Sequence, residues 1–142
     1  MTSDVDAKFT SPMAVQRAVR EVGEIHDWDD NWLNSEAAQF IPAYGKTVGW
    51  STLYADTAIS ISVASHEALL AMKLASARPG KDENDLAYLL SLNDVTTIDG
   101  AEALLESYYP GDGLKDAAVR ILASIFEKGL PPRPTPPEAP KI

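Results

Sequence analysis

Cysteine is absent from the 142-residue chain, and histidine occurs only twice. Without cysteine there can be no disulfide bond, no thiolate metal ligand and no thiol nucleophile. Basic residues are also scarce: 12 Lys and Arg stand against 21 Asp and Glu, and the formal net charge is -9. This balance disfavours a broad phosphate-binding surface, so a contact with nucleic acid would have to be local or supplied by a partner.

Long apolar runs are missing as well. No stretch approaches the roughly 20 apolar residues of a membrane-spanning helix. The first residues lack the basic segment and apolar stretch of a signal peptide. We therefore expect a cytoplasmic protein that does not meet the membrane. Hydrophobic residues make up 45% of the sequence, which indicates a globular chain with a single core of ordinary size.

Hydrophobic periodicity predicts strands in the first half of the chain and helices mainly in the second. The predicted strands cover residues 4–9, 47–53 and 57–63. The predicted helices cover residues 11–26, 31–40, 65–77, 82–92, 99–108 and 114–128. Two of these helices begin with a recognisable capping residue, Ser11 followed by Pro12 in one case and Ser65 in the other.

This order predicts an α/β (α+β) fold in one domain over residues 1–130. Its sheet part would occupy about 1–64 and its helical bundle about 65–130. From Pro131 to Pro140 six of ten residues are proline, and proline cannot continue a helix. We expect residues 131–142 to form a disordered, extended tail.

Two carboxylates near the start of the chain, Asp4 and Asp6, are the first candidate site. On a strand, side chains two residues apart point to the same face. Two carboxylates on one face can hold Mg²⁺, which favours oxygen ligands. The alternative is that they are solvated charges at a chain terminus.

A second candidate is the group of charged residues at and after the apolar segment Leu69–Ala75. Lys73 interrupts that segment and must reach water, pair with an acid or bind an anion. Asp82 and Asp85 fit the start of the next helix, where unpaired N–H groups and the helix dipole favour acidic side chains. Capping and pairing with Lys73 or Arg78 are compatible roles.

Other motifs are incomplete. The acidic run from Asp27 lacks the glycine and the final glutamate of a calcium loop. A leucine stands at position 70, where a zinc motif beginning at His66 needs its second histidine. Lys81 follows a glycine but lacks the Ser or Thr and the upstream glycine of a phosphate-binding loop. Trp28, Trp32 and Trp50 are interpreted as packing residues.

The segment from Ser65 to Leu86 resembles the "leucine-rich, K, then R, then (R/K)DxxDL" segment of minimal nucleotidyltransferases. These include toxin-type enzymes of abortive-infection toxin–antitoxin systems and actinobacterial relatives. Residues 2–7, Thr-Ser-Asp-Val-Asp-Ala, look like the Thr-x-Asp-x-Asp strand of the same proteins. Residues 30–34 and 108–111 are also similar, so the resemblance covers about residues 2–113.

The resemblance implies a mechanism. Asp4 and Asp6 would bind Mg²⁺, and Lys73 would contact the triphosphate of an NTP. Asp82 or Asp85 would organise the site or act as a base. Two further cations would assist phosphate binding, namely Arg78 and Lys81. The product would be a nucleoside monophosphate joined to an RNA or protein acceptor.

The chain departs from the family in two respects. Such enzymes carry a Gly-Ser motif before the Asp-x-Asp strand that grips the triphosphate, and here Asp4 follows Met1 by three positions. A third carboxylate is expected on the later strand, where residues 57–63 offer serine instead. Because lost positioning raises the barrier to reaction, we expect a truncated or degenerate nucleotidyltransferase-like protein of toxin–antitoxin or phage-defence type.

Three interpretations remain open. The chain is a non-catalytic interaction or scaffold protein, an enzyme completed by another chain, or the product of a misassigned start. An unpaired sheet edge would favour a homodimer or a protein partner through strand pairing.

Overall fold

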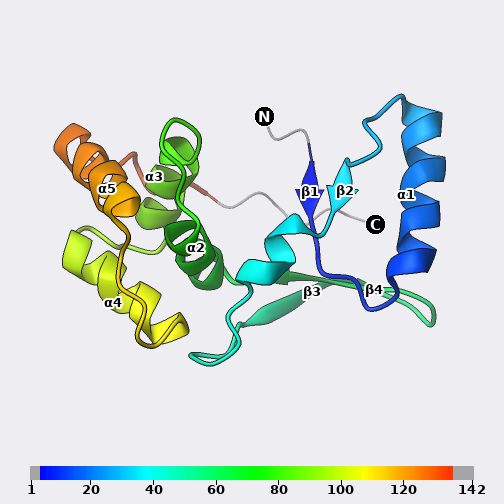
Figure 1. Cartoon of the computed structure of the whole chain (residues 1–142), viewed down its shortest axis with the longest axis horizontal. Coiled ribbons are helices and arrows are strands. Elements are labelled where there is room, and N and C mark those ends of the chain that lie inside the picture. The colour runs from blue at the N-terminus through cyan, green and yellow to red at the C-terminus, as the bar shows by residue number, and fades with distance from the viewer. Residues whose placement is uncertain (1–3, 136–142) are drawn as a thin grey trace. The chain divides into compact units, whose positions relative to one another are not determined.

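The computed structural model describes residues 4–135 and divides the chain into two compact units, Met1–Ile41 and Pro42–Ile142 (Figure 1). The described residues contain five α-helices, one 3₁₀ helix and two separate two-stranded sheets. The mixed α and β character agrees with the predicted class. Each unit has its own two-stranded sheet, where the sequence predicts one sheet part over about 1–64.

The N-terminal unit is built around a short parallel pair of strands. Strand β1 (Val5–Asp6) pairs with β2 (Leu33–Asn34), and helix α1 (Pro12–His26) makes the crossover that parallel strands require. The predicted strand over 4–9 is therefore only two residues long. Thr2 and Ser3 of the motif lie outside the described residues.

Helix α1 has the predicted bounds, and Pro12 occupies its first turn. The Ser11 side chain makes no capping hydrogen bond, contrary to expectation. The Trp32 indole N–H donates to the Val19 carbonyl at 2.9 Å. This hydrogen bond holds the segment that contains Trp32 against helix α1. The helix expected over 31–40 is reduced to the 3₁₀ helix η1 (Glu36–Phe40), because β2 takes its first residues.

In the C-terminal unit, β3 (Trp50–Ala55) and β4 (Ser60–Ala64) form an antiparallel hairpin. Both strands were predicted, and each begins three residues later than expected. The Asp56 carboxylate accepts hydrogen bonds from the backbone N–H groups of Ala58 and Ile59, both at 2.7 Å. These bonds hold the turn closed.

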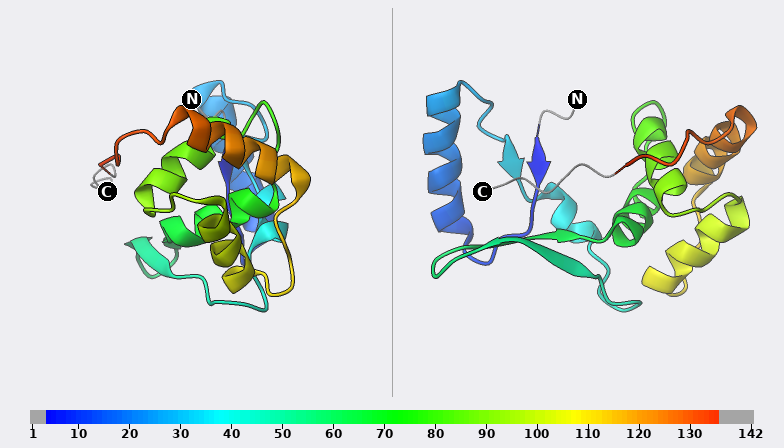
Figure 2. Two further views of the ribbon diagram at one scale, coloured as in Figure 1. Left: turned by 90° about the vertical axis from the view of Figure 1, so that its left-hand side faces the viewer. Right: turned by 180° about the vertical axis from the view of Figure 1, so that it is seen from behind.

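Four helices follow the hairpin and pack together (Figure 2): α2 (His66–Ala75), α3 (Glu83–Leu92), α4 (Ile98–Tyr108) and α5 (Asp116–Lys128). All four were predicted. The Ser65 hydroxyl caps α2 by accepting the Ala68 N–H at 3.3 Å. The core of the unit lies among these helices and consists of Leu70, Leu74, Leu86, Leu89, Leu90, Ala101, Leu105, Ile121, Leu122 and Ile125.

The residues after α5 are partly described. The Ser91 hydroxyl donates to the Pro131 carbonyl at 2.8 Å, and Arg133 forms an ion pair with Asp94 at 2.8 Å. Residues 131–135, the first part of the expected disordered tail, are thus described and make these contacts. Residues 136–142 lie outside the described residues. No helix within residues 4–135 has both the length and the apolar character to cross a membrane.

Candidate functional site

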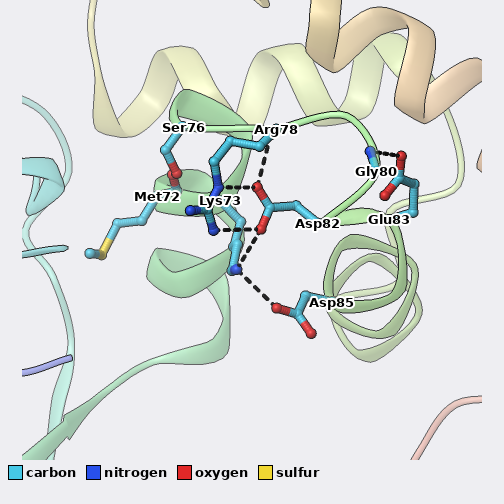
Figure 3. Close-up of polar contacts among 8 residues, drawn as sticks. All are labelled: Met72, Lys73, Ser76, Arg78, Gly80, Asp82, Glu83 and Asp85. Atoms are coloured by element: carbon cyan, nitrogen blue, oxygen red, sulfur yellow. Dashed lines mark hydrogen bonds and ion pairs between the residues drawn. The ribbon is translucent and has the colours of Figure 1, made fainter. Parts of the chain in front are cut away.

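The predicted site residues fall into both units. Asp4 and Asp6 belong to the N-terminal unit, and the other five belong to the C-terminal unit. There, the end of α2, the connecting loop and the first turn of α3 bring four of them together (Figure 3). We call this group the Lys73 cluster; it consists of Lys73, Arg78, Asp82 and Asp85.

Asp82 is the centre of the Lys73 cluster, and its side chain is only 2% exposed. One carboxylate oxygen accepts the backbone N–H of Arg78 at 2.8 Å and the Arg78 Nε–H at 3.0 Å. The other accepts Arg78 Nη2 at 3.1 Å and the Lys73 ammonium at 2.9 Å. The buried charge is thus fully compensated, as burial of a carboxylate demands.

This arrangement corrects one expectation. Asp82 stands at the N-cap position of α3, but its side chain makes no capping hydrogen bond. The carboxylate turns back to Arg78 and Lys73, since two cations stabilise a buried anion more than backbone N–H groups do. The loop is held further by Glu83, whose carboxylate accepts the Gly80 N–H at 2.6 Å. Sequence reasoning overlooked Glu83, although its place three residues after glycine in a turn was a usable signal.

Lys73 joins two carboxylates. Its ammonium contacts Asp82 and Asp85, each at 2.9 Å. An ammonium group has three donors, and the residues the structure describes supply no third acceptor. The Lys73 side chain is 30% exposed and that of Asp85 is 60% exposed. The cluster is therefore buried on the Asp82 side and open to solvent on the Asp85 side.

Burial and pairing act in opposite directions on the two central groups. Burial alone would raise the pKa of the Asp82 carboxyl, but the hydrogen bonds from Arg78 and Lys73 outweigh it and lower the pKa from 3.8 to about 2. Burial would lower the pKa of the Lys73 amine, but the bonds to Asp85 and Asp82 outweigh it and raise the pKa. Both groups are charged at neutral pH.

Asp82 is consequently unsuited to one of the two roles that the resemblance offers it, that of a base. A carboxylate offers about four acceptor positions, and here all four are taken. A group with a pKa near 2 is also a weak general base at neutral pH. The geometry instead fits a positioning role, in which Asp82 orients Lys73 and closes the loop.

The remaining cations of the segment are exposed. The Arg78 side chain is 62% exposed although its guanidinium contacts Asp82. Lys81 is exposed, and only its backbone N–H has a described partner, the Arg78 carbonyl at 3.2 Å. Both residues belong to the loop between α2 and α3.

Asp4 and Asp6 are exposed, and the Asn34 amide donates to Asp4 at 3.3 Å. Mg²⁺ is commonly held by one or two protein carboxylates together with substrate phosphates and water. Asp4 and Asp6 are of the residue type that such a site uses. Within residues 4–135, no group of three or more His, Asp or Glu residues is arranged to hold a metal ion by itself.

An ion pair in the C-terminal unit was not anticipated. Lys46 contacts Glu67 at 2.6 Å and lies over the Tyr108 ring, 5.6 Å from its centroid. Its backbone N–H donates to the Ser107 carbonyl at 2.7 Å. These contacts hold the segment before the hairpin against α2 and α4.

Comparison with known proteins yields no relatives: no protein-family model, curated protein or solved structure matches the chain.

Proposed function

We propose that the chain is a nucleotidyltransferase-like protein in which Lys73 is the contact for the triphosphate of an NTP. One observation carries the proposal. The resemblance names Lys73, Arg78, Asp82 and Asp85 as site residues, and they lie within 13 positions of the sequence. In the structure they form one hydrogen-bonded group that includes the part-exposed ammonium of Lys73.

The chemistry of Lys73 suits an incoming phosphate. Two carboxylates fix the position of its ammonium, and one N–H donor is left without a described acceptor. A preorganised cation loses little freedom when it meets an anion, and a charge-assisted hydrogen bond is stronger than a neutral one. Arg78 and Lys81 add positive charge beside the same loop.

Reduced or absent activity in this form is part of the proposal. Asp82 is occupied by its four hydrogen bonds, so the base, if one acts, is Asp85 at the exposed edge of the cluster. The role of Asp4 and Asp6 as holders of Mg²⁺, an ion that would stabilise charge on a phosphate, comes from the resemblance. A role in a toxin–antitoxin or phage-defence system, with RNA or protein as acceptor, rests on the resemblance alone.

The test is transfer of label from each α-labelled NTP, with Mg²⁺, to total RNA and protein. The wild type is compared with Lys73→Met, with Asp4→Ala/Asp6→Ala and with Lys46→Met. Label that is lost in the first two variants and kept in Lys46→Met supports the proposal, since Lys46 is also a part-exposed lysine paired with an acid. Label that all three variants retain would refute it.

A non-catalytic interaction protein is the second candidate. The saturation of the Asp82 carboxylate favours it, because such a cluster can serve the fold alone. Absence of label from every NTP, together with a stable complex of the chain, would select this function instead.

A further inference from the structure

The β3–β4 hairpin carries an uncovered apolar face. Along β4 and the turn before it, Ile59, Ile61 and Val63 are 55%, 45% and 46% exposed. Side chains two residues apart in a strand share one face, so these three form a stripe. A two-stranded hairpin has marginal stability in water unless further strands or a packed face support it. Exposure at this level marks a surface for association.

The outer edge of β4 is also unpaired. The Ile59 carbonyl accepts from the Asp56 N–H at 2.9 Å, and the Ser65 N–H donates to the Gly49 carbonyl at 2.8 Å. Residues 59 and 65 therefore turn their backbone groups toward the β3 side. The irregularity of the hairpin lies in β3, between Thr52 and Tyr54, so β4 alternates without interruption.

Because alternate residues of an antiparallel strand bond to opposite sides, the backbone groups of Ser60, Ser62 and Ala64 point to the open edge. Within the part of the chain that the structure describes, no backbone hydrogen bond reaches these groups from outside the hairpin. They are donors and acceptors for another strand.

The edge itself carries no charge that would oppose a second copy. Two copies of a chain with a net charge of -9 repel each other over most of their surface. Residues 57–65, Thr-Ala-Ile-Ser-Ile-Ser-Val-Ala-Ser, contain no charged side chain and no proline. The edge thus lacks the lysine or proline with which proteins usually prevent self-pairing.

We propose that β4 pairs with β4 of a second copy of this chain, antiparallel and centred on Ser62. In this register Ser62 lies opposite Ser62 of the other copy as a hydrogen-bonded pair, and Ser60 lies opposite Ala64. Ile61 then lies opposite Val63, so the two apolar stripes join. The product is a four-stranded sheet in the order β3, β4, β4, β3, with two-fold symmetry.

The first test measures the mass of the full chain by light scattering as its concentration rises. The proposal predicts a mass that rises from 15.3 kDa toward twice that value. Ser62→Pro removes an N–H that points to the open edge, so it spares the hairpin and abolishes the rise. Ser62→Ala keeps the N–H and should behave as the wild type. Far-UV circular dichroism checks that each variant is folded.

A charge pair tests the register. Ser62→Lys places two ammonium groups opposite each other on the symmetry axis, and Ser62→Glu places two carboxylates there. Each variant alone should remain at 15.3 kDa, and an equimolar mixture should form a heterodimer because opposite charges then face each other.

Three results would overturn the proposal. One is a wild-type chain that stays at 15.3 kDa up to about 1 mM. Another is a dimer that Ser62→Pro leaves intact, which would place the contact elsewhere. The third is a lysine and glutamate mixture that stays monomeric while Ser62→Ala dimerises, which would exclude pairing centred on Ser62.

Discussion

Asp82 accepts three hydrogen bonds from Arg78, one from its backbone N–H at 2.8 Å and two from its guanidinium at 3.0 and 3.1 Å. Arg78 precedes Asp82 by four residues in the loop that connects α2 and α3. A single buried carboxylate thereby closes the loop and, through its fourth hydrogen bond, fixes Lys73. Stability and the candidate site depend on the same group.

Replacing Asp82 should therefore destabilise the protein. In Asp82→Asn the uncharged amide no longer compensates the two cations, and we expect a loss of about 3 kcal/mol, the lower end for buried ion pairs because Arg78 and Lys73 can still reach water. Urea unfolding followed by circular dichroism measures it. In Asp85→Asn, which removes a pair at a 60% exposed side chain, the loss should stay below about 1 kcal/mol. Equal losses in the two variants would contradict a central role for Asp82.

The low pKa of Asp82 predicts that part of the free energy of unfolding is lost in acid. Its pKa is 3.8 in the unfolded chain and about 2 in the folded one. Since the folded pKa is the lower, this contribution is complete above about pH 4 and is lost as the pH falls toward 2. It amounts to about 2 kcal/mol. Unfolding free energies of the wild type and Asp82→Asn, measured from pH 5 to 2, should converge; a constant difference would contradict the assigned pKa.

Gly45 is predicted to tolerate no side chain. A Cβ atom at this position would meet the backbone of Tyr108 and Ser107, which cannot move aside cheaply. Gly45→Ala should lower the free energy of unfolding by about 1–3 kcal/mol. Gly113→Ala is the control, because its Cβ would meet only the flexible end of Glu102 at 3.5 Å. A Gly45→Ala variant as stable as Gly113→Ala would show that residues 45 and 107–108 are not packed as described.

The lack of native cysteine allows a covalent test of the paired hairpins. In Ser62→Cys the two thiols would face each other across the symmetry axis with Cα atoms about 5.5 Å apart, within the range of a disulfide. Mild oxidation should yield a covalent dimer on a non-reducing gel. Ser51→Cys, on the strand farther from the axis, should give much less. Equal yields of covalent dimer from the two variants would indicate that the disulfides form by random collision of chains and not in a paired sheet.

The helices were predictable because their apolar residues recur at helical spacing and bury one common core. Ser65, whose hydroxyl caps α2, and Pro12, at the start of α1, marked boundaries through local backbone chemistry that the sequence displays directly. The strands were less predictable. Alternation of isoleucine and serine located β4, but the bounds of a strand depend on where its partner begins and ends. The expectation for residues 4–9 failed for that reason, since β2 offers only two residues to pair with.

Part of the candidate site could be anticipated from the sequence. Pairing of Asp82 and Asp85 with Lys73 or Arg78 was expected as a role compatible with helix capping, and these four residues do contact one another. Asp4 and Asp6 belong to the other unit, and the described contact of Lys81 with this group is its backbone hydrogen bond to Arg78. Whether the Asp82 side chain caps α3 or pairs with cations depends on how deeply it is buried. Hydrophobic periodicity does not predict the burial of a single charged residue. The Lys46–Glu67 pair depends on a tertiary contact that no local pattern encodes.

The most direct test of the central claim, that Lys73 contacts a triphosphate, is the affinity of the chain for each NTP in the presence of Mg²⁺. The account predicts measurable binding by the wild type, weakened about tenfold or more in Lys73→Met because one charge-assisted hydrogen bond is lost. Binding by Lys46→Met should equal that of the wild type. Absence of binding to every NTP, or equal binding by the two lysine variants, would contradict the claim and leave the Lys73 cluster as a structural ion pair.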